Sequence, residues 1–143
     1  MSADELTARI EGIVHEETQV GERGVDLTVA EVYEVDVAGR VDFGGGELAD
    51  AELTHHDRTW RNRDDDYQWW HLDGGQYLIE YNESLSGDEP VVVQTREELR
   101  ARGAFHPTLS VTSLDRMPLS VAARGIRLKE NARVSTVLPQ SKW

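Results

Sequence analysis

One acid in the chain interrupts a segment that otherwise has the pattern of a β-strand. Asp26 lies between apolar neighbours in the alternating stretch Val25–Val29. Because aspartate is depleted in strands, it either faces solvent here or is kept for a chemical purpose. The pattern taken alone favours the solvent-facing position.

A second candidate for chemistry is a short predicted helix over residues 96–102, with Thr95 as its cap. Arginines near the start of a helix could help free backbone N–H groups hold an anion. However, Glu97 and Glu98 occupy the first turn, where they complement the helix dipole and repel a phosphate. The segment by itself therefore favours a solvated amphipathic helix.

Histidines and aromatic residues gather in and beside a polar stretch at residues 47–67. His55, His56 and His71, together with Asp64–Asp66, could ligate a divalent metal. Adjacent loop residues rarely converge on one ion without a defined spacing, so we expect a solvated surface and no metal held by the protein alone. The same region holds four aromatic residues, Trp60, Tyr67, Trp69 and Trp70. They could stack on a base or sugar, although packing in a core or a subunit interface is commoner.

The charge balance narrows the range of partners. The chain has 27 acidic residues against 15 lysines and arginines, a net charge of −12, and only two of its bases are lysines. An acidic surface repels phosphates and anionic lipids, so we expect neither nucleic acid nor a membrane as a partner. An acidic excess with so few lysines favours a halophilic protein, since salt screens self-repulsion. An ordinary acidic protein is the alternative.

Other features exclude further classes of protein. No cysteine is present, which rules out disulfides, cysteine-ligated metals and a thiol nucleophile. No apolar run approaches the roughly 20 residues that span a bilayer. The first residues lack the pattern of a secretory signal. These observations predict a cytoplasmic location.

The elements that would position these residues are mainly β-strands. The length of 143 residues predicts one domain, 1–143. Ser2 and Glu5 form a capping-box pattern that predicts a helix over Ala3–Ile10. Strands are expected at 25–35, 40–43, 69–72, 77–81, 91–94, 108–112, 119–121, 125–128 and 132–138. Many short strands with two short helices indicate an antiparallel β-barrel or jelly-roll domain.

Taken in order, four segments resemble the dUTPase / dCTP deaminase family, most of all its archaeal dUTPase-type members. Gly24–Val29 resembles the first Asp-Leu motif, and Gly74–Glu83 resembles the Gly turn, strand and Asn-Glu that precede the second motif. Thr95–Gly103 occupies the place of the Pro-Arg-Ser-Ser-Leu helix. Gly125–Val134 is similar to the late strand–turn–strand, and the resemblance spans about residues 3–138.

The resemblance implies a distorted antiparallel β-barrel, usually assembled as a homotrimer with active sites at subunit boundaries. It implies a deoxyuridine or deoxycytidine nucleotide as ligand, with dUTP hydrolysis to dUMP and pyrophosphate as the family activity and Mg²⁺ bridging the phosphates. On this basis Asp26 and Asp115 are the expected catalytic carboxylates. Arg96, Arg133 and Ser135 are the expected substrate contacts, Ser135 standing where the family has a late glutamine.

The chain departs from the family pattern in two motifs. Glu97 and Glu98 replace the phosphate-holding serines of the second motif. The third motif, which supplies the uracil pocket and a carboxylate, is matched only by the shorter Ser110–Pro118, with Asp115 out of register. These departures keep a second interpretation open, a barrel that has lost catalysis and binds nucleotides or another protein. A dCTP deaminase ranks third, and an unrelated metal- or sugar-binding β-domain remains if the resemblance is accidental.

Overall fold

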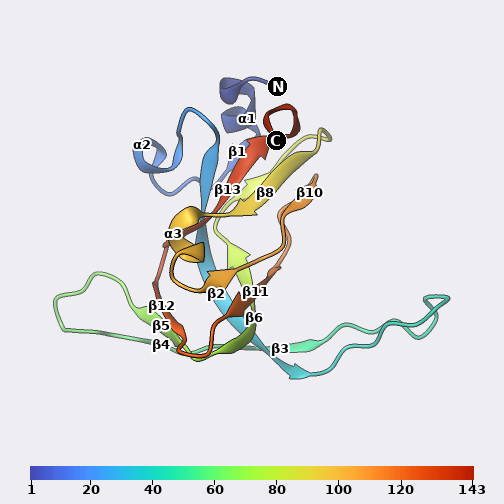
Figure 1. The fold of residues 1–143 in the computed structure, drawn as a ribbon, viewed down its shortest axis with the longest axis vertical. Helices are drawn as coiled ribbons and strands as arrows, with labels where there is room; N and C mark the ends of the chain where they lie inside the picture. The colour runs from blue at the N-terminus through green and yellow to red at the C-terminus, as the bar shows by residue number, and fades with distance from the viewer.

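The fold is built around one long strand, β2 (Val25–Val37), at the centre of a curled antiparallel sheet (Figure 1). The computed structural model describes residues 1–143, except for the side chain of Lys142. The strands follow the order β10-β8-β13-β2-β6-β11-β9, and β3 also pairs with β2. Their bounds are β3 (Glu52–His55), β6 (Gly75–Tyr81), β8 (Val91–Thr95), β9 (Ala104–Phe105), β10 (Leu109–Val111), β11 (Met117–Val121) and β13 (Arg133–Pro139).

Smaller elements cover the ends of this sheet. One small sheet has the order β12-β5-β4, from β12 (Ile126–Lys129), β5 (Trp69–Leu72) and β4 (Arg58–Thr59), and another pairs β1 (Ile10–Glu11) with β7 (Ser84–Leu85). The helices are α1 (Ala3–Arg9), α2 (Glu16–Gln19), α3 (Glu97–Arg100) and a terminal 3-10 turn η1 (Gln140–Lys142). Among the described residues, no helix is long and apolar enough to cross a bilayer.

The core explains why β2 can carry an acid. Val25, Leu27 and Val29 are at most 1% exposed. Successive side chains of a strand point to opposite faces, so burying these three turns Asp26 to the other face of the sheet. Trp70 on β5 is also fully buried, which makes it part of the core.

Two segments project from the barrel on opposite sides in the view of Figure 1. One is the arm formed by the end of β2, β3 and the residues between them, where Val41 and Phe43 are fully exposed. The other connects β4 to β5 and contains the exposed Trp60. His55 and His56, at the base of these arms, face single carboxylates on β2. Among the described residues, no three His, Asp or Glu side chains are grouped so that they could hold a metal.

The predicted class of fold is confirmed, and two local predictions are wrong. Residues 40–43 form no strand, and only Arg40 makes an isolated bridge, to Ala49. The turn between them is held by the carboxylate of Asp42, which accepts two backbone N–H groups. The predicted 96–102 helix is reduced to α3, and Thr95 does not cap it. The Thr95 hydroxyl bonds instead to the backbone of His106, a partner that local sequence cannot reveal.

Candidate functional site

The main candidate site is a hollow of about 640 Å³ at one end of the sheet. The connection between α2 and β2 lines one side of it, and the end of β8 with α3 lines the other. Strands β2 and β13 supply its floor. Four arginines and four acids lie around it, namely Arg23, Arg96, Arg100, Arg133, Glu22, Asp26, Glu97 and Glu98.

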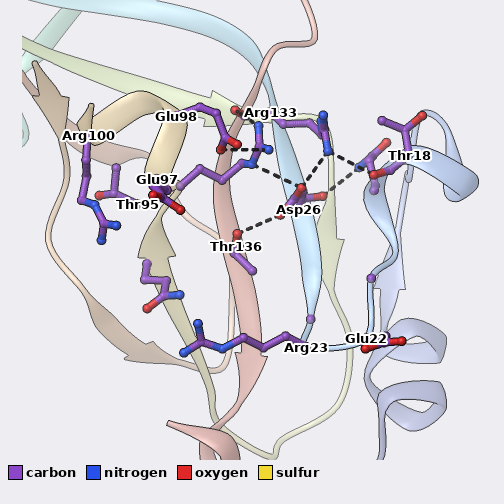
Figure 2. A pocket seen from close by; sticks show the side chains of 15 residues that line it. Thr18, Glu22, Arg23, Asp26, Thr95, Glu97, Glu98, Arg100, Arg133 and Thr136 are labelled. Carbon is purple, nitrogen blue, oxygen red and sulfur yellow. Dashed lines mark hydrogen bonds and ion pairs between the residues drawn. The ribbon is translucent and has the colours of Figure 1, made fainter. Parts of the chain in front are cut away.

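Asp26 is the residue on which these elements converge (Figure 2). Its Oδ2 lies 3.3 Å from Nε of Arg96 and 3.1 Å from Nη1 of Arg133. Its Oδ1 accepts a 2.8 Å hydrogen bond from the hydroxyl of Thr136. The side chain is 18% exposed. The expectation of a simple solvent-facing acid is therefore wrong, because the carboxylate is held by two guanidinium groups and a hydroxyl.

Strand register explains this meeting. In the antiparallel pair of β2 and β13, Thr136 lies directly opposite Asp26, which puts both side chains on one face. A register shift between Arg133 and Ser135 then lets Arg133 reach the same carboxylate. Strand β8 pairs with the other edge of β13 and ends at Thr95, which places Arg96 at the rim.

Arg96 is engaged on both sides. Besides its contact with Asp26, its Nη2 lies 2.9 Å from Oε2 of Glu98 on α3. The Arg96 side chain is only 16% exposed. Part of its positive charge is therefore already balanced by carboxylates, which leaves less of it for a bound phosphate. Arg23 and Arg100 line the same hollow and have no ion pair within the described part of the chain.

Gln19, which no sequence pattern singles out, ties the rim of the hollow to its floor. It is 3% exposed. Its Oε1 accepts the N–H groups of Val14 and His15, each at 2.8 Å. Its Nε2 donates to the backbone oxygen of Asp26 at 2.9 Å and to Oε2 of Glu83 at 2.8 Å. All hydrogen-bonding capacity of the side chain amide is thus used to hold the α2 connection against β2.

Ser135, predicted to contact substrate, lies away from the hollow. It is fully buried, and its hydroxyl is 2.6 Å from the Tyr81 hydroxyl and 2.7 Å from Nε2 of His106. Nδ1 of His106 lies 2.7 Å from the carbonyl oxygen of Pro107, so it carries the proton. Ser135 then donates to Nε2 and accepts from Tyr81. The serine and histidine form a buried structural network, without the exposed hydroxyl that a nucleophile requires.

This network predicts a loss of stability in acid. Burial lowers the pKa of His106 below its ordinary 6.5 and outweighs the bond to Pro107, which acts in the opposite direction. The folded protein thus resists protonation that the unfolded chain accepts, so the His106 contribution is complete above about pH 6.5 and declines as the pH falls below it. Urea unfolding at pH 7.5 and 5.5 should show a smaller decline for His106→Asn than for the wild type. An equal decline in both would contradict the assignment.

Asp115 also lies outside the hollow of its own chain. It is exposed in the connection between β10 and β11, where its Oδ2 accepts a 3.1 Å hydrogen bond from Ser113. The structure therefore brings together three of the five predicted site residues, Asp26, Arg96 and Arg133. It leaves Asp115 on the surface and Ser135 in the core.

Comparison with known proteins places this geometry in a family. No protein-family model matches the chain. The chain is 30% identical over 141 residues to a probable deoxyuridine 5'-triphosphate nucleotidohydrolase of Methanosarcina acetivorans, covering 90% of this chain and 76% of the relative. Its fold is similar to the crystal structure of a 2'-deoxycytidine 5'-triphosphate deaminase from Agrobacterium tumefaciens, with a TM-score of 0.62 and 14% identity over 96% of this chain. The chain spans 46% of that deaminase, about half its length. From the curated relative and the shared fold, the chain belongs to the dUTPase / dCTP deaminase family.

Proposed function

We propose that the hollow around Asp26 binds the phosphates of dUTP and supports its slow hydrolysis to dUMP and pyrophosphate. The observation that carries this proposal is the convergence of Asp26 on β2, Arg133 on β13 and Arg96, which follows β8, on one open hollow. Guanidinium groups match the geometry and charge of phosphate oxygens. A carboxylate among them can orient an attacking water or accept its proton.

The second carboxylate of the reaction would come from another subunit. Asp115 is exposed and does not line the hollow of its own chain. In a homotrimer with sites at subunit boundaries, Asp115 of one subunit would complete the site of its neighbour. This arrangement accounts for a site that is half formed within one chain.

The donors at the hollow fit Mg²⁺, which prefers oxygen ligands and often binds through one or two carboxylates together with substrate phosphates. Glu22 is an exposed acid that lines the hollow without an ion pair among the described residues, and it offers such oxygens. Bound there with the triphosphate, Mg²⁺ would neutralise phosphate charge and polarise the bond that breaks. The residues of the chain would position the phosphates. Arg133 and Arg96 orient the phosphates, and Asp26 holds both guanidinium groups in place.

One observation favours a second candidate function, nucleotide binding without turnover. Glu98 already occupies one face of the Arg96 guanidinium at 2.9 Å. With Glu97 beside it, the hollow holds as many acids as arginines. A triphosphate would enter a site with no excess of positive charge, which weakens stabilisation of the charge that develops during hydrolysis.

We expect purified protein with Mg²⁺ in molar KCl to release pyrophosphate from dUTP faster than from dTTP, and to release no ammonia from dCTP. Arg133→Gln should lower the dUTP rate at least tenfold, because it removes a phosphate contact and one partner of Asp26. Arg63→Gln, an exposed arginine outside the hollow, is the matched control and should change nothing.

Ligand binding separates the two candidates. A nucleotide at 100 times its dissociation constant adds about 2.7 kcal/mol to the stability of the folded state. A thermal shift with dUTP but no pyrophosphate release would support binding without turnover. If the folded protein shows no pyrophosphate release and no thermal shift with dUTP, both candidate functions are wrong.

A further inference from the structure

A second hollow, of about 580 Å³, lies beyond the other end of α3 and shares no residue with the first. Three connections meet there: the segment after α3, the turn between β5 and β6, and the turn between β11 and β12. Arg102, Arg124 and Arg127 line it together with His71, and Asp73 is its one acid. A cluster of three arginines against one carboxylate is unexpected in a chain of net charge −12.

These arginines are not used in ion pairs. Within the described part of the chain, the arginines with carboxylate partners are Arg58, Arg96, Arg116 and Arg133, all outside this hollow. Arg102 donates from Nη1 to the backbone oxygen of Glu98 at 2.9 Å, which fixes one side of its guanidinium group. Like charges brought together without partners repel one another. A bound anion would remove this repulsion.

The backbone beneath the arginines is closely packed. A Cβ on Gly74 would lie 2.6 Å from the Cα of Ala123, so only glycine lets the β5–β6 turn approach the β11–β12 turn. Gly125 has a φ of +77°, and a side chain there would strike the carbonyl of Leu72. The N–H of Ala122 also bonds to the Gly103 carbonyl at 2.9 Å, which joins the segment after α3 to the same turn. The three connections thus form one rigid support.

The strand register adds a fourth group. Arg127 on β12 lies directly opposite His71 on β5, so the two side chains are neighbours on one face. The backbone oxygen of His71 is held by Nε2 of His56 at 2.9 Å, which fixes β5 at this point. Guanidinium and imidazole N–H groups are both donors suited to phosphate oxygens.

We propose that this second hollow is a binding site for a phosphate-bearing anion with at least two phosphates, such as free pyrophosphate or the phosphate chain of a nucleotide. A diphosphate offers enough charge and enough acceptor oxygens to engage three separate guanidinium groups, which a single carboxylate does not. The site is independent of the proposed hydrolysis, because it uses none of the residues around Asp26.

The test is calorimetric titration with inorganic pyrophosphate, without Mg²⁺, at the lowest KCl concentration that preserves the circular dichroism of the folded protein. The double variant Arg124→Gln/Arg127→Gln should weaken pyrophosphate binding at least tenfold. The matched control Arg61→Gln/Arg63→Gln removes two exposed arginines between β4 and β5 and should bind as the wild type does.

A second pair of variants distinguishes the two hollows. Arg96→Gln/Arg133→Gln should leave pyrophosphate binding at the second site intact, even if it abolishes every effect of dUTP. Three results would each overturn the proposal: loss of pyrophosphate binding only in Arg96→Gln/Arg133→Gln, equal binding by Arg124→Gln/Arg127→Gln and the wild type, or no binding at all.

Titration with dUDP then identifies the source of the phosphates. Competition between dUDP and pyrophosphate that disappears in Arg124→Gln/Arg127→Gln shows that the site accepts a nucleotide, and its absence restricts the site to free pyrophosphate.

Discussion

Replacing Glu97 and Glu98 by serine is expected to tighten the binding of dUTP at least tenfold. Both acids line the first hollow, and Glu98 occupies Arg96 at 2.9 Å. A like-charge pair about 4 Å apart costs about 1 kcal/mol in water and about 4 kcal/mol at an effective dielectric of 20. A tenfold gain requires about 1.4 kcal/mol. The substitution therefore removes a repulsion of sufficient size and releases Arg96 for the phosphates.

Calorimetry with dUTP and Mg²⁺ at fixed KCl measures this gain. The matched control is Asp88→Ser/Glu89→Ser, which removes two adjacent exposed acids in the connection between β7 and β8, outside the hollow. The control should change the affinity less than twofold. An equal gain in both double variants would attribute the effect to net charge, and no gain in either would contradict phosphate binding beside α3.

The second large effect is expected at Glu83, a carboxylate that is 3% exposed. Its Oε1 accepts the N–H of Thr28 at 2.8 Å, and its Oε2 accepts the Thr28 hydroxyl at 2.6 Å and Nε2 of Gln19 at 2.8 Å. Glu83→Ala would leave these buried donors without an acceptor, at about 1–3 kcal/mol each. We expect Glu83→Ala to lower the free energy of unfolding by about 3–5 kcal/mol. The Gln19 link to the first hollow would be lost with it.

Urea unfolding at fixed KCl gives this difference. Glu80→Ala is the control: Glu80 lies on β6, and its side chain is 41% exposed and paired with the exposed Arg116. Because exposed ion pairs contribute little, we expect Glu80→Ala to cost at most about 1 kcal/mol. Equal losses for the two variants would show that the buried hydrogen bonds of Glu83 do not support the fold as described.

Structural features could be predicted from the sequence where the interactions that cause them involve residues close together in the chain. The capping box is one example, since Ser2 accepts the N–H of Glu5 at 3.1 Å at the start of α1. Alternation in Val25–Val29 correctly predicted a strand, because its three apolar residues at every second position share one face and fill the core. The order of the motifs led to the family. The resemblance also named Asp26, Arg96 and Arg133, which the structure brings together, while their roles stay predictions.

Local sequence failed where long-range contacts decide. Thr95 is a residue type that commonly caps a helix, yet its hydroxyl instead donates a hydrogen bond to the backbone oxygen of His106. The resemblance pointed to Ser135, which the register of β13 turns into the core beside Tyr81. Gln19 has no recognisable signature either, because its bonds to the backbone of Val14 and His15 follow no sequence motif and its bond to Glu83 spans 64 positions.

The sequence by itself determined the class of fold, the family and the acidity of the chain, because composition, periodicity and motif order are properties of the linear chain. The tertiary structure alone decided which charges are neighbours. Strand pairing brought Asp26 to Arg133, and packing of glycine turns gathered Arg102, Arg124 and Arg127 around one hollow. Coulomb energies depend on distances in space, and neighbours in space here come from distant positions in the chain.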